Sequence, residues 1–235
     1  MVRKIFYSTF LLLLNVICFG QQPAEMGKFD NAYLGEVKSE NAALGERIKT
    51  FPKAVQVFNQ KVAQLIRSGN YNEALNLTIE IDSLYPDLAD IKNFKGKLWS
   101  RQNNLIEAVI AFNEAIKLNP ENKWFYIYAA TSLAQQGKHE MAIEKIDKLI
   151  LKSPEWSIGY NIKAAILHDA GRHQEALQAY NKAINASPKS AQILTNRGDL
   201  YLFLNQKELA LSDYQAALKL QPDYEWAKTK LDTIK

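Results

Sequence analysis

Proline recurs in this sequence at a fixed interval. Six of the seven prolines stand 34 residues apart. A period in this range indicates a stacked-repeat architecture, in which one small structural unit is written several times along the chain. In a true repeat, other residue types also recur at fixed distances from each proline. Each such set of equivalent positions, called a column here, tests the stacked-repeat prediction. The six prolines are Pro52, Pro86, Pro120, Pro154, Pro188 and Pro222.

Three further columns keep this register, counted back from the last five prolines. Alanine stands twelve residues before each of them, at Ala74, Ala108, Ala142, Ala176 and Ala210. A small or slim residue stands twenty-four residues before them, at Val62, Gly96, Ala130, Ala164 and Gly198. Glycine or asparagine stands seventeen residues before them, at Gly69, Asn103, Gly137, Gly171 and Asn205.

Each column has a physical reason. Apolar residues on both sides of the Gly/Asn column recur with a helical period, which predicts two helices in every repeat. In the third repeat these helices would span 124–136 and 140–152. Glycine and asparagine tolerate the left-handed conformation that ends a helix, so their column is the turn. The small columns let the paired helices approach closely, and proline, which lacks an amide donor, ends the second helix.

The pattern resembles the tetratricopeptide repeat, whose signature is W-x2-L-G-x2-Y…A-x3-F…P. The stretch SIGYNIKAAILHDAGRHQEALQAYNKAINASPKS carries the matching residues Tyr160, Ala164, Leu167, Gly171, Ala176, Tyr180, Ala183 and Pro188. The resemblance implies an all-α fold, a right-handed α-solenoid of stacked antiparallel helix pairs. In this register the repeats are 55–88, 89–122, 123–156, 157–190 and 191–224.

The two ends of the repeat array differ. Residues 225–235 begin a further first helix, with Ala227 and Leu231 in register, and are predicted to cap the array. In residues 21–54 the alanine and small columns fall on Glu40 and Lys28, so a sixth repeat is not predicted there. We expect residues 21–30 to form a flexible lead, followed by a helix compatible with capping the first repeat.

Residues 1–20 are predicted to be a secretory signal peptide. Two early cations precede an apolar run from Ile5 to Ile17, and Cys18-Phe19-Gly20 forms a small-x-small end. The run is shorter than the roughly 20 apolar residues that a membrane span needs. We therefore expect an exported protein without a transmembrane span, located in the periplasm or outside the cell.

An outer-membrane lipoprotein is the alternative, with a lipid anchor on Cys18, the only cysteine. Lipoprotein signals usually have leucine three positions before the cysteine and a small residue directly before it. This chain has Asn15 and Ile17 there. If cleavage instead follows Gly20, the mature chain has no cysteine and forms no disulfides.

Charge and composition argue against several function classes. The formal net charge is +4, and without residues 1–20 it is 27 basic minus 25 acidic side chains, or +2. This small excess does not predict nucleic-acid binding. The chain is 47% hydrophobic with few glycines and prolines, which predicts a folded protein.

The sequence does not predict catalysis. It contains no G-x-S-x-G, no H-E-x-x-H, no phosphate-binding glycine loop and no EF-hand loop. His139 and His173 are 34 residues apart and share a repeat position, while His168 and His173 are separated by the turn. We therefore predict no catalytic residue, no metal site and no cofactor.

The resemblance assigns ligand binding to the first helices, which line the concave side of such repeats. The predicted partner-binding residues are Asn59, Asn93, Phe94, Lys97, Arg101, Trp124, Tyr128 and Asn161, and Asp90 and Gln192 share that side. An asparagine amide both donates and accepts hydrogen bonds, which suits an extended peptide. Aromatic rings beside cations are typical of interface hot spots. The alternative is that Trp124 and Tyr128 only pack between adjacent repeats.

The Lys/Asn/Asn/Lys/Arg clamp with which some family members bind acidic chaperone C-termini is not supported. In repeats one to three, the matching positions hold Asn59, Ala63, Phe94, Trp124 and Tyr128.

These observations predict a non-catalytic, exported interaction scaffold that binds a peptide or partner helix during envelope assembly or secretion. Two alternatives remain, a carrier of cell-wall glycan or peptide and an accessory subunit of an exported enzyme complex. The sequence predicts neither the identity of the partner nor the oligomeric state.

Overall fold

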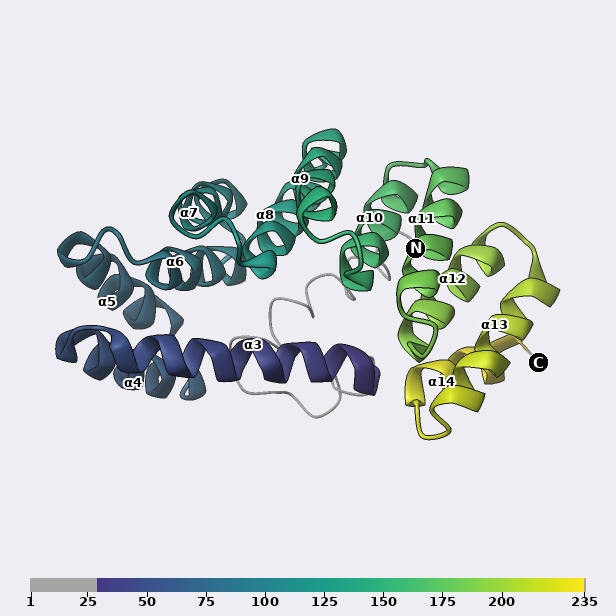
Figure 1. Ribbon diagram of the computed structural model, residues 1–235, viewed down its shortest axis with the longest axis horizontal. Coiled ribbons are helices and arrows are strands. Elements are labelled where there is room, and N and C mark those ends of the chain that lie inside the picture. The colour runs from purple at the N-terminus through teal and green to yellow at the C-terminus, as the bar shows by residue number, and fades with distance from the viewer. Residues whose placement is uncertain (1–28, 235) are drawn as a thin grey trace. The chain divides into compact units, whose positions relative to one another are not determined.

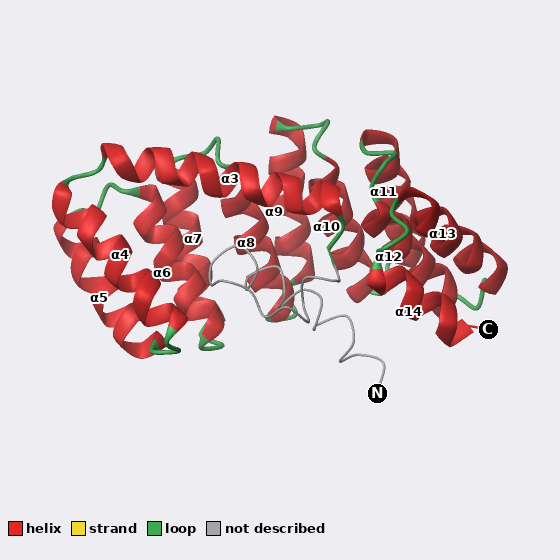
Figure 2. Cartoon of the chain, turned by 90° about the horizontal axis from the view of Figure 1, so that it is seen from below, coloured by secondary structure: helices red, strands yellow, loops and turns green. Residues whose placement is uncertain are grey.

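The computed structural model describes residues 29–234, all of whose regular elements are α-helices. The predicted signal peptide 1–20, Cys18 and residues 21–28 of the predicted flexible lead lie outside the described residues. The last two residues of that lead, Phe29 and Asp30, are buried with exposed fractions of 2% and 1%, so the flexible lead does not extend to residue 30. Figure 1 shows the helices in chain order, and Figure 2 shows that loops join them throughout. The helices are α3 (Asn31–Thr50), α4 (Lys53–Arg67), α5 (Tyr71–Leu84), α6 (Ala89–Arg101), α7 (Leu105–Leu118), α8 (Lys123–Gln135), α9 (His139–Lys152), α10 (Ser157–Asp169), α11 (His173–Ala186), α12 (Ala191–Phe203), α13 (Lys207–Leu220) and α14 (Glu225–Ile234).

The predicted all-α solenoid is confirmed at the level of its helix pairs. In the third repeat, α8 and α9 agree with the predicted helices 124–136 and 140–152 to within one residue. Consecutive helices pack on one another, from α4 to α8 and again from α10 to α14. None of the helices among the described residues is long and apolar enough to cross a membrane.

The described chain divides into two compact units. Unit 1 comprises residues 38–145, and unit 2 comprises residues 29–37 together with 146–234. The boundaries therefore fall inside α3 and α9, and each unit is described by itself below.

The turn column adopts the backbone conformation that its residue types predict. All five of its members have positive φ: Gly69 (79°), Asn103 (61°), Gly137 (76°), Gly171 (78°) and Asn205 (58°). Only this left-handed conformation favours glycine and asparagine over other residues, so the column marks the end of each first helix. The prolines stand two residues beyond the second helices, where they cannot interrupt a helical hydrogen bond.

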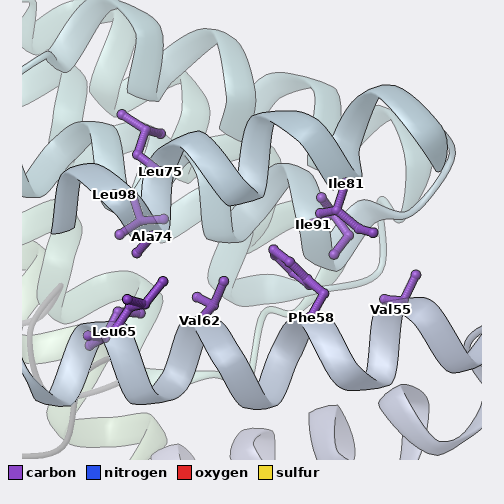
Figure 3. Packing of buried hydrophobic residues seen from close by; sticks show 10 residues of the cluster. Val55, Phe58, Val62, Leu65, Ala74, Leu75, Ile81, Ile91 and Leu98 are labelled. Atoms are coloured by element: carbon purple, nitrogen blue, oxygen red, sulfur yellow. The ribbon is translucent and has the colours of Figure 1, made fainter. Parts of the chain in front are cut away.

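In unit 1, the core begins between the helices of the first repeat and the first helix of the next. Val55, Phe58 and Val62 of α4 are buried together with Ala74 of α5 and Leu98 of α6 (Figure 3). The alanine column closes the contact within each pair, because Ala74, Ala108, Ala142, Ala176 and Ala210 all have an exposed fraction of 0%. A larger side chain at these positions has no space to occupy.

Unit 2 ends on the helix that the sequence analysis predicted at 225–235. Ala227 of α14 is buried with Tyr224 and Ala217, and Leu231 packs against the cluster of Ala210 and Tyr214. Ala227 and Leu231 therefore both face the last helix pair, and α14 covers the apolar side of that pair.

Candidate interaction surface

The first helix of each pair carries the residues to which partner binding was assigned. We call the surface formed by α4, α6 and α8 the first-helix face of unit 1, and that formed by α10 and α12 the first-helix face of unit 2. Asn161 belongs to unit 2, and the other seven predicted residues belong to unit 1. Arg101 is exposed, Asn59 and Phe94 are half-buried, and the remaining five are buried: Asn93, Lys97, Trp124, Tyr128 and Asn161.

Four of these side chains form one group in unit 1, which we call the aromatic–lysine group: Phe94, Lys97, Trp124 and Tyr128. The Lys97 ammonium lies 4.5 Å from the centroid of the Tyr128 ring and 5.9 Å from that of Phe94. The rings of Trp124 and Tyr128 are stacked, with centroids 6.4 Å apart. Within the described residues, no carboxylate contacts the Lys97 ammonium. Its cation therefore lies against aromatic faces only.

Helix geometry places this group. Trp124 and Tyr128 are four residues apart on α8, so they project from the same side of that helix. Asn122 fixes where α8 begins, because its Oδ1 accepts the Trp124 amide at 3.0 Å. Ser100 of α6 and Ser132 of α8 share a buried hydrogen bond of 3.2 Å, which joins the two helices that supply the group.

Tyr128 also packs between adjacent repeats, as the alternative interpretation of the sequence predicted. Its ring centroid is 5.5 Å from that of Phe112 on α7, and its exposed fraction is 1%. The same ring therefore contacts both Phe112 and the Lys97 cation of the preceding repeat. A partner reaches Tyr128 or Trp124, which is 3% exposed, only after the surface opens.

The other predicted partner-binding residues make separate contacts and do not form one group. The Arg101 guanidinium lies 4.0 Å from the centroid of the Tyr71 ring, where it stacks on the aromatic face. The Asn93 Oδ1 is buried without a hydrogen-bond partner among the described residues. In unit 2, the Asn161 Oδ1 accepts a hydrogen bond from Asn196 at 3.0 Å. The asparagine column therefore does not present three equivalent amides.

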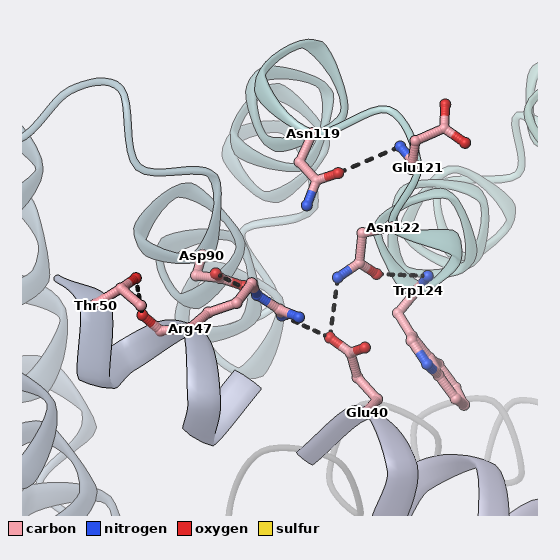
Figure 4. Close-up of polar contacts among 8 residues, drawn as sticks. All are labelled: Glu40, Arg47, Thr50, Asp90, Asn119, Glu121, Asn122 and Trp124. Carbon is pink, nitrogen blue, oxygen red and sulfur yellow. Dashed lines mark hydrogen bonds and ion pairs between the residues drawn. The ribbon is translucent and has the colours of Figure 1, made fainter. Parts of the chain in front are cut away.

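Helix α3 binds the first-helix face of unit 1 through charged side chains, a contact that the sequence analysis missed (Figure 4). Arg47 donates two hydrogen bonds of 2.9 Å to the carboxylate of Asp90, the second residue of α6. It donates a third, also of 2.9 Å, to Glu40, and Glu40 accepts another from the Asn122 amide. The hydrogen bond to Asp90, helped by Glu40, raises the pKa of the Arg47 guanidinium above its ordinary value. Through Asp90 and Asn122, helix α3 therefore contacts both ends of the second repeat.

The residues at the start of α3 bind the first-helix face of unit 2. Asp30 is 1% exposed and accepts hydrogen bonds from the Ser190 hydroxyl at 2.6 Å and the Gln192 amide at 2.9 Å. Glu36 accepts a hydrogen bond of 3.1 Å from the Trp156 indole. No repeat pattern or motif in the sequence pointed to Asp30, because it lies outside the repeats.

The structure confirms the turn predicted between His168 and His173 and adds a contact between their rings. His168 and His173 lie on either side of the turn between α10 and α11, yet their Nδ1 atoms are 3.0 Å apart. Both rings contact Phe203 of α12. Burial, together with the charge of His173, lowers the pKa of His168 to about 4. Among the described residues, no group of three histidine, cysteine or acidic side chains could hold a metal ion.

Two family models match the sequence. The model described as "Tetratricopeptide repeat" matches residues 89–122, and the one described as "Psidin, N-terminal TPR repeats region" matches residues 121–231. A search of curated proteins found no match at the significance required.

Solved structures of low sequence identity share the fold. MamA from Desulfovibrio magneticus superposes with a TM-score of 0.61 at 14% identity, covering 73% of this chain and 97% of that one. The TPR protein TTC0263 from Thermus thermophilus gives 0.61 at 16% identity, covering 76% and 97%. YrrB, described as "a TPR protein with an unusual peptide-binding site", gives 0.54 at 19% identity, covering 74% and 89%. At these identities, the likeness concerns the fold alone.

Proposed function

Because the chain belongs to the tetratricopeptide repeat family, we propose that it is a non-catalytic scaffold that binds a peptide or helix of a partner protein on its first-helix faces. The peptide-binding site named for YrrB, a protein of the same fold, supports this class of function. The observation that carries the proposal for this chain is the aromatic–lysine group of unit 1.

The group has the chemistry of an anchor site. Lys97 is 3% exposed, and among the described residues its cation is paired with aromatic rings instead of a carboxylate. A desolvated ammonium gains strongly from a carboxylate or carbonyl that enters the same surface. The neighbouring Trp124 and Tyr128 rings offer apolar area for an anchoring side chain, and Arg101, four residues beyond Lys97 on α6, is an exposed second cation.

Access to this anchor site requires an opening step. Because Lys97, Trp124 and Tyr128 are buried, only the open fraction of molecules binds, and the apparent affinity falls by that fraction. In Figure 4, the Trp124 side chain points toward the side of unit 1 on which α3 lies. Glu40 of α3 is hydrogen-bonded to Asn122, two residues before Trp124. Release of α3 is therefore the opening step that we assign.

Affinity capture from an envelope extract tests the proposal. The bait is the chain 21–235, and the test variant is Lys97→Met, which keeps an unbranched side chain shorter by one atom and removes the charge. The control is Lys61→Met, which removes a charge from an exposed side of α4. We expect one protein to be captured by the wild type and the control and to be lost, by at least tenfold, with Lys97→Met. Equal capture by all three chains would refute the site.

The same extract separates this function from its alternatives. Retention on isolated cell wall, without a protein band, would favour the glycan carrier.

Export is also part of the proposal, with the chain acting in the periplasm or outside the cell in envelope assembly or secretion. The mass of the mature protein tests it: a chain that begins at Gln21 supports export without a lipid, and an intact N-terminus contradicts export.

A further inference from the structure

We propose that residues 29–37 are an intramolecular ligand of the first-helix face of unit 2, and that the external partner of this face is a helix beginning with the same chemistry. That chemistry is an aspartate at the helix cap with aromatic side chains beside it. The inference goes beyond the aromatic–lysine group of unit 1, because it concerns the first-helix face of unit 2 and names the class of partner that fits it.

The Asp30 carboxylate joins two helix N-termini. Its Oδ1 accepts the Tyr33 amide at 2.8 Å and so caps α3. Its Oδ2 accepts the Gln192 amide and the Ser190 hydroxyl at the start of α12. The first amides of a helix lack internal partners and carry a partial positive charge, so a carboxylate is the group that suits both sites.

The receiving site is built from α12 itself. Ser190 is the cap of α12, because its Oγ accepts the Ile193 amide at 3.3 Å, and the same hydroxyl donates to Asp30. Ser190 and Gln192 are both 5% exposed. These donors are thus buried beneath residues 29–37, and a carboxylate arriving from another molecule would find them already oriented.

Apolar side chains of the segment complete the recognition. Phe29, Tyr33 and Val37 are spaced four residues apart, and all three are buried, with exposed fractions of 2%, 4% and 4%. The rings of Phe29 and Tyr33 are stacked, with centroids 4.8 Å apart. One stripe of the segment therefore provides the apolar contact, while Asp30 and Glu36 provide the two acidic contacts with unit 2.

The fit between the segment and the face is incomplete. A cavity of about 70 Å³ remains between them, lined on the segment side by Ala32, Tyr33 and Glu36. Gln192 lines its other side, and the Gln192 Oε1 is buried without a hydrogen-bond partner among the described residues. An external helix that filled this space and donated a hydrogen bond to Gln192 would bind more tightly than the resident segment.

Both buried residues of α3 lie in this segment, and the rest of the helix has no buried residue. Of the 20 residues of α3, only Tyr33 and Val37 are buried, whereas α8 buries eleven of its 13 residues. Elements with few buried apolar contacts open at a lower free-energy cost than the core. The resident segment is thus suited to exchange with an external helix, although its attachment to the chain gives it a high effective concentration.

A labelled peptide of residues 29–44, with both ends blocked, tests the proposal against full chains 21–235. Three receptors are compared. The first is the wild type, and the second is Asp30→Ala, which weakens the resident segment and leaves the face intact. The third is Asp87→Ala, a control at an exposed position. We expect fluorescence anisotropy to show peptide binding at least tenfold tighter to Asp30→Ala than to the wild type or control. A peptide carrying Asp30→Asn should bind Asp30→Ala at least tenfold more weakly than the parent peptide.

Two results would overturn the proposal: equal peptide affinity for all three receptors, or equal affinity of the two peptides. Amide hydrogen exchange on the wild-type chain adds a check that does not depend on the folding of a variant. The amides of α3 should exchange at least 100-fold faster than those of α12, and equal rates would contradict a releasable segment. No external partner enters these assays, so their failure would leave the capture test at Lys97 unaffected.

Discussion

Gly96 shows how one missing side chain permits the close contact within a repeat. A Cβ atom at this position would lie 2.6 Å from Cε1 of Phe112, and a Cβ at Gly198 would lie 2.7 Å from Cε1 of Tyr214. Such short separations force a buried ring to move. The glycines in the small column are therefore required by the aromatic residue of the facing helix, because the two occupy the same space.

Substitution of Gly96 by alanine should accordingly destabilise the protein. We expect a loss of about 1–3 kcal/mol from overpacking against Phe112, which outweighs the gain of up to about 1 kcal/mol in helix propensity. Gly45→Ala is the matched control, because a Cβ there meets nothing within 4 Å and only the propensity gain remains. Urea unfolding monitored by circular dichroism measures both. A Gly96→Ala protein as stable as the control would contradict the packing account.

His168 gives the stability a dependence on pH. Burial and His173 lower its pKa from 6.5 to about 4 in the folded protein, so the unfolded chain binds the proton more readily. Stability is therefore fully present above about pH 6.5 and falls as the pH decreases toward 4, by up to about 1.4 kcal/mol per pH unit. His168→Gln should flatten this part of the stability profile. An unchanged slope between pH 6.5 and 4 would count against the assignment.

At the scale of elements, α3 differs from the repeat helices in what holds it. The repeat helices are fixed by buried alanines and aromatic rings, whereas α3 is fixed to unit 1 by the bidentate pair of Arg47 with Asp90. Asp90 is largely buried, with 6% of its side chain exposed, while Arg47 is 30% exposed. Removal of the arginine alone would leave a buried carboxylate unpaired, which costs more than loss of the pair itself.

A double-mutant cycle on Arg47→Ala and Asp90→Asn isolates this contact. We expect Arg47→Ala to destabilise the wild type more than it destabilises the Asp90→Asn protein, with a coupling energy of about 1–3 kcal/mol. Hydrogen exchange in residues 38–50 should accelerate in both single variants. Additive losses of stability would show that the pair does not hold α3.

The sequence predicts the elements that repeat and misses the contacts that occur once. The turn column, the alanine column and the helix pairs follow from residue types that recur every 34 residues, each recurrence adding evidence. Arg47 and Asp90 are 43 residues apart, and Asp30 and Ser190 are 160 apart, and neither pair carries a pattern. Glu40 illustrates the difference: its place in the alanine column excluded a sixth repeat, but nothing indicated its bond to Asn122.

The same limit applies to the candidate site. The family resemblance selected Lys97, Trp124 and Tyr128 from their positions on the first helices, and the structure brings these three together in unit 1. Their burial depends on side chains beyond their own helices, which a position within a repeat does not encode. The His168–His173 contact was missed for a similar reason, because both rings also pack against Phe203 of the following repeat, which spacing within one repeat does not encode.

At the scale of the whole molecule, the chain is a series of packed helix pairs, and we propose that the first helices hold a partner. Each unit contains its own buried clusters, so the stability of the array is a sum over repeats and their neighbours. In the proposed function, binding is a property of the first-helix faces, and the second helices serve mainly as support. The described second helices do carry exposed apolar side chains, such as Ile106 of α7 with an exposed fraction of 64%.

Photocrosslinking in the native cell tests this central claim most directly. A benzophenone amino acid replaces Phe94, on the first-helix face of unit 1, or Ile106, on a second helix. The account predicts a partner adduct from position 94 that disappears when Lys97→Met is added, and no such adduct from position 106. An adduct formed from position 106 alone, or one from position 94 that persists with Lys97→Met, would contradict it.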